Sequence, residues 1–479
     1  MLGAAATLVG ASAPPASAEP LTVMTFNVWY GGVQVDFAQI GRAIRAADAD
    51  VVGVQEPEGS LRRIARAAHM PYVDESLHLI SRYPLFAARV GGVRIAYAAI
   101  DLDHVVAIAN VHLTATPYGP ELVRDGGSAR AVLKLERETR LPEIKPYLKP
   151  LSGLARRGVP VFIVGDMNSP SHLDWTPAVA AVRAQVAYPL AWPVSKALAG
   201  AGFRDSYRDA HPDPVARPGL TWTPGTPPPL IAPTETLDRI DWVMASGPAP
   251  TMSSRLVGEL GGPDVDIGLE RYGSDHRAVA STFDAEPGRA PRLVDAEPRV
   301  ARAGQTLTIR YTTTSGGAGR RIGILPAHGR RPIVTLPIEQ ATDHLAAFFG
   351  TGVLGPGSYR AALLDGRGRI EATSPFWVLA RGARPRIAAT KRSFAAGEPI
   401  RLRWRNAPGN KLDWVGIYRA GPLDVYDYLG FSYLGALPHG RVGFSAGDLY
   451  VRLKPGRYVA GLFMDDGYSL LARTSFTVR

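Results

Sequence analysis

The sequence has 479 residues, of which 46% are hydrophobic, 51 are glycine and 41 are proline. At about 150 residues per domain, this length predicts roughly two to four domains. The hydrophobic share excludes a chain that is disordered throughout, and the many turn formers disfavour a long helical bundle. Because there is no cysteine, disulfide bonds and thiol catalysis are excluded, so packing or a bound metal is expected to stabilise the fold.

The net charge of +11 is unevenly distributed. Residues 289–479 contain 28 Lys and Arg against 13 Asp and Glu, a net +15, whereas residues 1–288 contain 26 against 30, a net −4. The basic character therefore belongs to the C-terminal part. Such a charge could attract an anionic polymer or surface over long range, in a way that salt weakens.

The chain begins with a small, apolar segment, "MLGAAATLVGASAPPASA", that has no charge. Ala16-Ser17-Ala18 fits the small residues before a signal-peptidase site, so residues 1–18 are predicted to be a removed signal and the mature protein to be secreted. The positively charged start of such signals is missing, which indicates that the signal begins further upstream. An uncleaved alanine-rich tail is the alternative. No other segment reaches the roughly 18 apolar residues that a membrane-spanning helix requires.

Residues 20–285 mix apolar strands with amphipathic helices. "LTVMTFNVW" alternates, "VVGVQE" and "VFIVGD" are continuous apolar runs, and "DFAQIGRAIRAADAD" has apolar residues at helical spacing. Both kinds of strand pattern together fit two stacked sheets covered by helices, an α-β-β-α sandwich within the α/β class. We expect this region to be the catalytic domain.

The rest of the chain consists of short β-type runs separated by Gly and Pro, and it repeats itself. "PRLVDAEPRVARAGQTLTIRY" resembles "PRIAATKRSFAAGEPIRLRW", and "GPGSYRAALLDG" resembles "KPGRYVAGLFMDDG". A unit of this size and strand spacing is typical of an immunoglobulin-like β-sandwich. The sequence therefore predicts two tandem sandwiches, at residues 291–380 and 384–479.

Polar side chains follow several of the predicted strands of the first region. Any one of them is more often a turn former or a cap than a functional group. Together they supply carboxylates, amides and imidazoles from separate strands to what could be one rim. They are Asn27, Glu56, His112, Asp166, Asn168, Asp241, Asp275 and His276. Oxygen-rich sets of this kind suit Mg²⁺, Mn²⁺ or Ca²⁺ more than zinc and indicate metal-assisted chemistry on phosphate.

The motifs "FNVW", "QE", "SRYPL", "HLTA", "GDMN", "RIDWV" and "SDHRAV" occur in this order. The combination resembles the endonuclease/exonuclease/phosphatase superfamily, also called the deoxyribonuclease I-like fold, over about Leu21 to Phe283. "GDMN" followed by "RID" and then "SDH" is its most specific part. The resemblance implies a metal-dependent phosphoric ester hydrolase.

For the cofactor, the resemblance implies Mg²⁺, with Mn²⁺ or Ca²⁺ as alternatives. Glu56, with Asn27 beside it, would hold the cation that neutralises the scissile phosphate. Asp275 would contribute to a metal position near Asn27.

For catalysis, the resemblance implies that Asp166 orients or deprotonates the attacking water and that Asn168 holds a phosphate oxygen. His276 would face the phosphorus, either as a general base or as a cationic stabiliser, with Asp241 orienting its ring. His112 would donate to a phosphoryl oxygen. Asp238 lies three residues before Asp241 and is the alternative partner of the histidine.

The substrate stays open at this point. The superfamily includes nucleases, phospholipases C and phosphatases, so the partner is a phosphate ester of nucleic acid, phospholipid or a small molecule. A nuclease is expected to carry a basic groove, which the net charge of residues 1–288 disfavours. A catalytically inactive cell-surface or polymer-binding protein is the alternative of another class.

Overall fold

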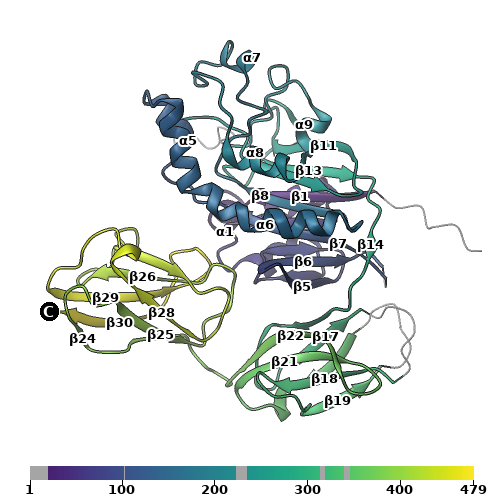
Figure 1. The fold of residues 1–479 in the computed structure, drawn as a ribbon, viewed down its shortest axis with the longest axis vertical. Helices are drawn as coiled ribbons and strands as arrows, with labels where there is room; N and C mark the ends of the chain where they lie inside the picture. Colours follow the sequence, from purple (N-terminus) through teal and green to yellow (C-terminus); the bar gives the residue numbers. More distant parts are fainter. Residues whose placement is uncertain (1–19, 102, 223–234, 313–318, 339–345) are drawn as a thin grey trace, which may run out of the picture.

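A computed structural model of the chain describes residues 20–101, 103–222, 235–312, 319–338 and 346–479. The predicted signal at residues 1–18 lies outside these ranges. Figure 1 shows a catalytic region in purple to teal, followed by a first C-terminal unit in green and a second in yellow. Within the described ranges, no helix is both long and apolar enough to cross a membrane.

The catalytic region is built on two sheets. The first sheet has the order β12 (Val265–Leu269), β11 (Thr251–Glu259), β13 (Ala278–Phe283), β1 (Leu21–Asn27), β2 (Val51–Gln55), β4 (Leu79–Ser81) and β3 (Tyr72–Asp74). The second has the order β5 (Leu85–Val90), β6 (Val93–Ala99), β7 (His104–His112), β8 (Val161–Asp166), β10 (Asp241–Ser246) and β9 (Arg204–Asp205), with β14 (Gly288–Arg289) paired to β7. Apolar side chains of both sheets, such as Val23 and Phe162, share one buried core, so the sheets pack face to face.

Helices cover the outer face of each sheet. The first sheet is covered by α2 (Phe37–Ala46) and α3 (Leu61–Ala68), and the second by α6 (Arg140–Ala155) and α8 (Pro193–Gly200). The remaining helices are α1 (Trp29–Gly32), α4 (Gly119–Arg124), α5 (Ala129–Glu138), α7 (Pro177–Ala180) and α9 (Ser206–Ala210). In α2 the apolar Ile40 and Ile44 lie on the buried face, and Asp36 caps the first turn by accepting from the Ala38 N–H. The predicted α-β-β-α sandwich is confirmed.

Each C-terminal unit consists of a small and a larger sheet. In the first unit they are β15 (Val294–Glu297), β17 (Thr306–Tyr311), β20 (Ala346–Gly350), and β16 (Val300–Arg302), β22 (Ile370–Leu379), β21 (Gly357–Leu364), β18 (Arg321–Pro326), β19 (Val334–Pro337). In the second they are β23 (Arg386–Ala389), β25 (Ile400–Arg405), β28 (Gly440–Phe444), and β24 (Ser393–Phe394), β30 (Leu470–Val478), β29 (Gly456–Phe463), β26 (Trp414–Arg419), β27 (Gly430–Tyr433). Equivalent strands hold equivalent places, as the repeat in the sequence predicts. An immunoglobulin-like relationship and the domain boundaries stay predictions.

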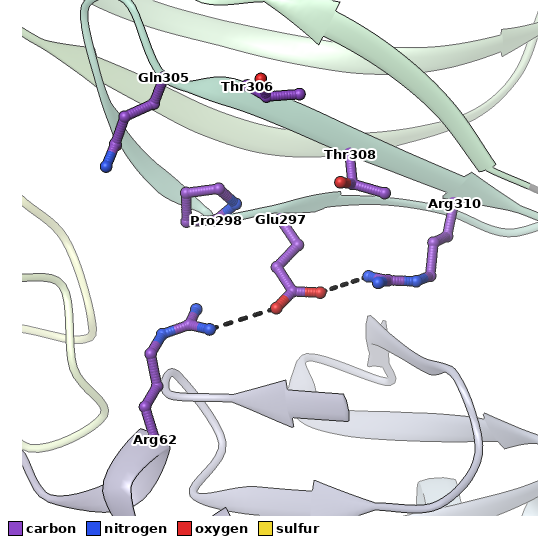
Figure 2. Close-up of a pocket in the computed structure, with 7 residues that line it drawn as sticks. All are labelled: Arg62, Glu297, Pro298, Gln305, Thr306, Thr308 and Arg310. Atoms are coloured by element: carbon purple, nitrogen blue, oxygen red, sulfur yellow. Dashed lines mark hydrogen bonds and ion pairs between the residues drawn. The ribbon is translucent and has the colours of Figure 1, made fainter. Parts of the chain in front are cut away.

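The first C-terminal unit contacts the catalytic region through charged side chains. Figure 2 shows Glu297 between Arg62 of α3 and Arg310 of β17, with 3.3 Å between the Arg62 guanidinium and the carboxylate. These groups line a cavity of about 380 Å³ together with Gln305 and Thr308. Arg62 also pairs with Glu75 at 2.9 Å, so two carboxylates balance the two arginines where the two parts meet.

Candidate active site

Strand pairing brings the predicted polar residues to one edge of the two sheets. β1 and β2 run parallel with Asn27 opposite Gln55, so Glu56 follows at the same edge. β7 and β8 also run parallel and place His112 opposite Asp166. The antiparallel strand β10 begins with Asp241 opposite Asp166. The apolar runs end together because the core ends there, which is why each run is followed by a polar side chain.

His276 lies between two carboxylates. Its Nδ1 is 2.9 Å from Oδ2 of Asp241, and its Nε2 is 3.7 Å from Oδ2 of Asp166. All three side chains are nearly fully buried. Burial favours the neutral ring, but the charges of Asp241 and Asp166 outweigh burial and raise the pKa of His276 to about 10. At neutral pH the ring is therefore a cation that is held in a fixed orientation.

Trp222 completes the surroundings of this histidine. Its ring centroid is 4.7 Å from that of His276, at an angle of 44° between the planes. The backbones of the two residues also form an isolated antiparallel bridge. The sequence motifs did not point to Trp222, because its place beside the ring depends on a loop that returns from elsewhere in the chain.

Glu56 and Asp166 share the amide of Asn27. Asn27 Nδ2 donates to Oε1 of Glu56 at 3.0 Å and to Oδ2 of Asp166 at 3.2 Å. Asn27 Oδ1 accepts from the backbone N–H of Trp29 at 3.1 Å, and Glu56 Oε2 accepts from that of Tyr30 at 3.1 Å. Asn27 therefore orients the Glu56 carboxylate in this structure, and direct ligation of a metal by its oxygen stays a prediction.

The donor set fits a hard divalent cation. Asp275 Oδ1 is buried, and no described residue forms a hydrogen bond with it. Burial raises the pKa of Asp275 to about 7, with His276 acting in the opposite direction and Glu56 adding to the increase. Ligand atoms of Asp166, Asp241 and His276 also lie within 4.8 Å of one another. Because Asp241 is engaged with the histidine ring, we expect the cation to lie nearer Glu56 and Asp275.

His112 and Asn168 both lie beside Asp166. His112 Nε2 is 3.6 Å from Oδ2 of Asp166. Asn168 has a positive φ of 45°, which turns the chain after β8, and its backbone N–H donates to Asp166 Oδ1 at 2.8 Å. One N–H of its amide donates to the Leu113 carbonyl at 3.0 Å. Each residue thus lies at the same edge as Asp166, as the sequence predicted.

Asp238 has a different place. It accepts from the Trp175 indole N–H at 3.0 Å and from the Tyr118 hydroxyl at 3.2 Å. Asp241, and not Asp238, faces the histidine ring. Trp175 and Trp192 form a buried edge-to-face pair with ring centroids 5.0 Å apart, so they belong to a packed cluster over the helices.

Sequence reasoning missed the contribution of the second C-terminal unit. The sequence motifs did not include His78, which is buried and whose Nε2 is 2.6 Å from Oδ1 of Asp465. The next residue, Asp466, is near enough to His112 and Glu56 for their charges to act on it. A signal was present, because the second repeat reads "FMDDG" where the first reads "LLDG".

The chain is similar in sequence to a known family and to a protein of unassigned function. The sequence model of the Endonuclease/Exonuclease/phosphatase family matches residues 24–276. An uncharacterized protein of Caenorhabditis elegans is 28% identical over 258 residues, which cover 48% of this chain and 79% of that protein.

Solved structures are also similar. An endonuclease/exonuclease/phosphatase from Beutenbergia cavernae is 16% identical, covers 75% of this chain and 99% of its own, and has a TM-score of 0.35. TDP2 from Caenorhabditis elegans is 16% identical, covers 55% and 75%, and has a TM-score of 0.35. An AP endonuclease from Archaeoglobus fulgidus is 16% identical, covers 55% and 100%, and has a TM-score of 0.34.

The chain thus has two stacked sheets with carboxylates and a histidine at one edge. The family match extends over more than half of the chain and includes this edge. This protein belongs to the endonuclease/exonuclease/phosphatase family, whose members are metal-dependent phosphoester hydrolases.

Proposed function

We propose that the protein is a secreted, divalent-metal-dependent phosphodiesterase in which an activated water attacks the phosphorus. The observation that carries this proposal is the placement of a cationic His276 between Asp241 and Asp166 at the edge where Glu56 and Asp275 meet. Phosphoryl transfer depends mostly on preorganised positive charge and positioning, and this edge supplies both.

In this proposal Glu56 and Asp275 hold the cation, and Asn27 orients Glu56. When bound, Mg²⁺ or Mn²⁺ supplies positive charge that polarises the phosphate and stabilises the departing oxygen. The protein contributes an oxygen-rich pocket whose carboxylates repel one another without the cation.

Asp166 accepts the proton of the attacking water. Burial raises the pKa of Asp166, with the charge of Asp241 adding to the increase, so the carboxylate accepts a proton more readily than an exposed one. The bond from the water oxygen to phosphorus forms and the ester bond opposite to it breaks. The departing alkoxide takes up a proton from solvent to become the alcohol, and Asp166 releases its proton to solvent.

His276 acts as a cationic stabiliser rather than as a general base, since a ring with a pKa of about 10 already carries its proton at neutral pH. Asp241 fixes the ring through Nδ1, which leaves the Nε2–H for a phosphoryl oxygen. In this proposal His112 and Asn168 hold the remaining oxygens.

Hydrolysis of bis(p-nitrophenyl) phosphate by the full-length protein tests the proposal. We expect activity that requires Mg²⁺ or Mn²⁺, disappears with chelator and returns when metal is added. His276→Ala and Asn168→Ala should lose activity, whereas His104→Ala, at the opposite and exposed end of β7, should keep it. Full activity in both site variants would refute the site, and no hydrolysis with any metal would favour the binding-protein alternative.

Secretion rests on the predicted signal at residues 1–18 and is tested separately. Mass spectrometry of the protein recovered from culture medium should show a mature chain that begins at Glu19. Recovery only inside the cells would contradict export without bearing on the catalytic site.

A role in binding an anionic polymer or surface rests on the net charge of +15 in residues 289–479. Such attachment is electrostatic, so it should weaken as salt is raised. Cosedimentation of the full chain with anionic vesicles across a salt series checks this expectation, with neutral vesicles as the control.

A further inference from the structure

The second C-terminal unit is held against the catalytic region beside the active site (Figure 1). The His78–Asp465 pair, 2.6 Å between Nε2 and Oδ1, is at most 2% exposed on either side chain. Lys411 of this unit is partly buried in the contact, and its Nζ donates to the Asn110 carbonyl of β7 at 2.8 Å. Buried polar contacts of this kind fix one relative position, because a shift would leave charged groups unpaired.

The turn between β29 and β30 reaches the chain that follows β2. The Gly59 N–H donates to Asp465 Oδ2 at 2.9 Å, and Met464 lies so close that a Cβ on Gly59 would be 2.7 Å from its terminal methyl group. A Cβ on Gly467 would be 3.0 Å from the carboxyl carbon of Glu58. The turn therefore lies directly against the segment that begins with the Glu56 site.

Asp466, between these contacts, lies near enough to His112 and Glu56 for their charges to act on it. The Tyr433 hydroxyl donates to its Oδ1 at 2.5 Å and fixes the carboxylate. Burial raises the pKa of Asp466, His112 lowers it and Glu56 raises it again, so both site residues are electrostatic neighbours. A side chain from the second unit thus shares its surroundings with the residues placed in the active site.

Tyrosines from both parts meet at the same mouth. Tyr426 and Tyr468 of the second unit have ring centroids 4.4 Å apart, and Tyr426 is 69% exposed. Tyr30 of the catalytic region is 42% exposed, and its backbone N–H binds Glu56. Burial, the charge of Glu56 and the nearby Tyr426 raise the pKa of Tyr30 to about 12. Exposed aromatic faces next to a phosphate-binding edge are available to the organic part of a substrate.

We propose that the second C-terminal unit forms one wall of the active site and binds a cationic group of the substrate there. This tyrosine wall consists of Tyr30, Glu58, Tyr426, Asp466 and Tyr468. The assignment of the group to a substrate rests on the proposed phosphodiesterase activity.

The chemistry of the tyrosine wall selects a cation. Tyrosine faces attract a quaternary ammonium or similar cation through the ring quadrupole, and carboxylates strengthen the attraction. Among the described residues, neither Glu58 nor Asp466 forms an ion pair with a lysine or an arginine. The second unit as a whole contains more Lys and Arg than Asp and Glu, yet Asp466 is acidic at the wall. A second phosphate would be repelled here, which disfavours a polynucleotide.

Binding measurements test the wall without requiring turnover. Full-length protein with Mg²⁺ should bind choline phosphate about tenfold more tightly than 3,3-dimethylbutyl phosphate, its uncharged isostere, by calorimetry. Tyr426→Leu and Asp466→Asn should each remove most of this preference. Equal affinity for the two ligands, or tighter binding of a dinucleotide than of choline phosphate, would overturn the inference.

Asp365→Asn is the matched control, because Asp365 lies at the equivalent turn between β21 and β22 of the first unit, where its side chain accepts from Arg367 and Arg369. It should leave the preference for choline phosphate unchanged. An equal loss in Asp365→Asn and Asp466→Asn would also overturn the wall. If the protein prefers the cationic ligand but hydrolyses no diester, the tyrosine wall is supported and the proposed phosphodiesterase activity is refuted.

Discussion

The floor of the active site and the tyrosine wall are built in different ways. The floor consists of side chains such as His276, Asp241 and Asn27, which are at most 4% exposed and bond to one another. The wall consists of half-exposed side chains such as Tyr30 and Tyr426, and another unit carries part of it. The buried charges that act on the phosphate therefore lie inside one region. The groups proposed to bind the rest of the substrate lie between two regions, whose sequences can vary independently.

The largest effect is expected when the floor of the active site loses the charged ring of His276. His276→Ala should lower kcat/KM for bis(p-nitrophenyl) phosphate by about 10²–10³-fold, since the cationic group that stabilises the phosphoryl oxygens is removed. Steady-state kinetics with saturating metal measure the loss. A reduction below threefold would mean that the floor is not where the chemistry occurs.

The next largest effect is expected at the contact that holds the second C-terminal unit against the catalytic region. His78→Leu leaves Asp465 buried without its partner, which is expected to lower the free energy of unfolding by about 3–5 kcal/mol. Urea unfolding followed by tryptophan fluorescence measures the change. The double variant His78→Leu/Asp465→Leu should lose less, because two apolar side chains leave no buried carboxylate without its partner; equal losses would contradict a stabilising contact between His78 and Asp465.

Metal affinity should respond to the residue that orients Glu56. Asn27→Ala removes the amide that binds Glu56 Oε1, and the concentration of Mg²⁺ for half-maximal activity should rise by about 10–100-fold. Activity at saturating metal should recover in part. If the half-maximal concentration is unchanged, Asn27 does not act through the metal site.

The contribution of Asp465 to the free energy of unfolding should fall only at low pH. Burial alone would raise the pKa of Asp465, but the charge and hydrogen bond of His78 and the Gly59 N–H lower it overall. A carboxyl whose folded pKa lies below its unfolded value, about 3.9, stabilises fully above that value and loses the contribution as pH falls through the folded pKa. The stability difference between wild type and Asp465→Asn should therefore be constant from about pH 7 to pH 5 and shrink below pH 4.

The smallest effect is expected in the first C-terminal unit. Asp365 is in an exposed turn and accepts from neighbours in the sequence, so Asp365→Asn should change the free energy of unfolding by less than about 0.5 kcal/mol. Activity and metal dependence should not change. A marked loss of activity would show that the two C-terminal units are less different in function than their positions indicate.

The sequence by itself determined the fold of the catalytic region and the edge where the site lies. Apolar runs such as "VFIVGD" specify strands, and a strand that ends at the edge of a core must end in a polar residue. The identity of the polar residues at several strand ends therefore predicted that Asp166, His276 and Glu56 converge, and the repeat predicted two similar C-terminal units.

Only the tertiary structure decided which acid faces the histidine and which unit adjoins the site. Asp238 and Asp241 are three residues apart, and the register of β10 against β8 places Asp241 at the edge, while Asp238 turns toward Trp175. Likewise, the two repeats are similar in pattern, and His78 pairs with Asp465 across almost the whole length of the chain. Contacts between distant segments depend on how their surfaces pack together, and local patterns of hydrophobicity do not predict that packing.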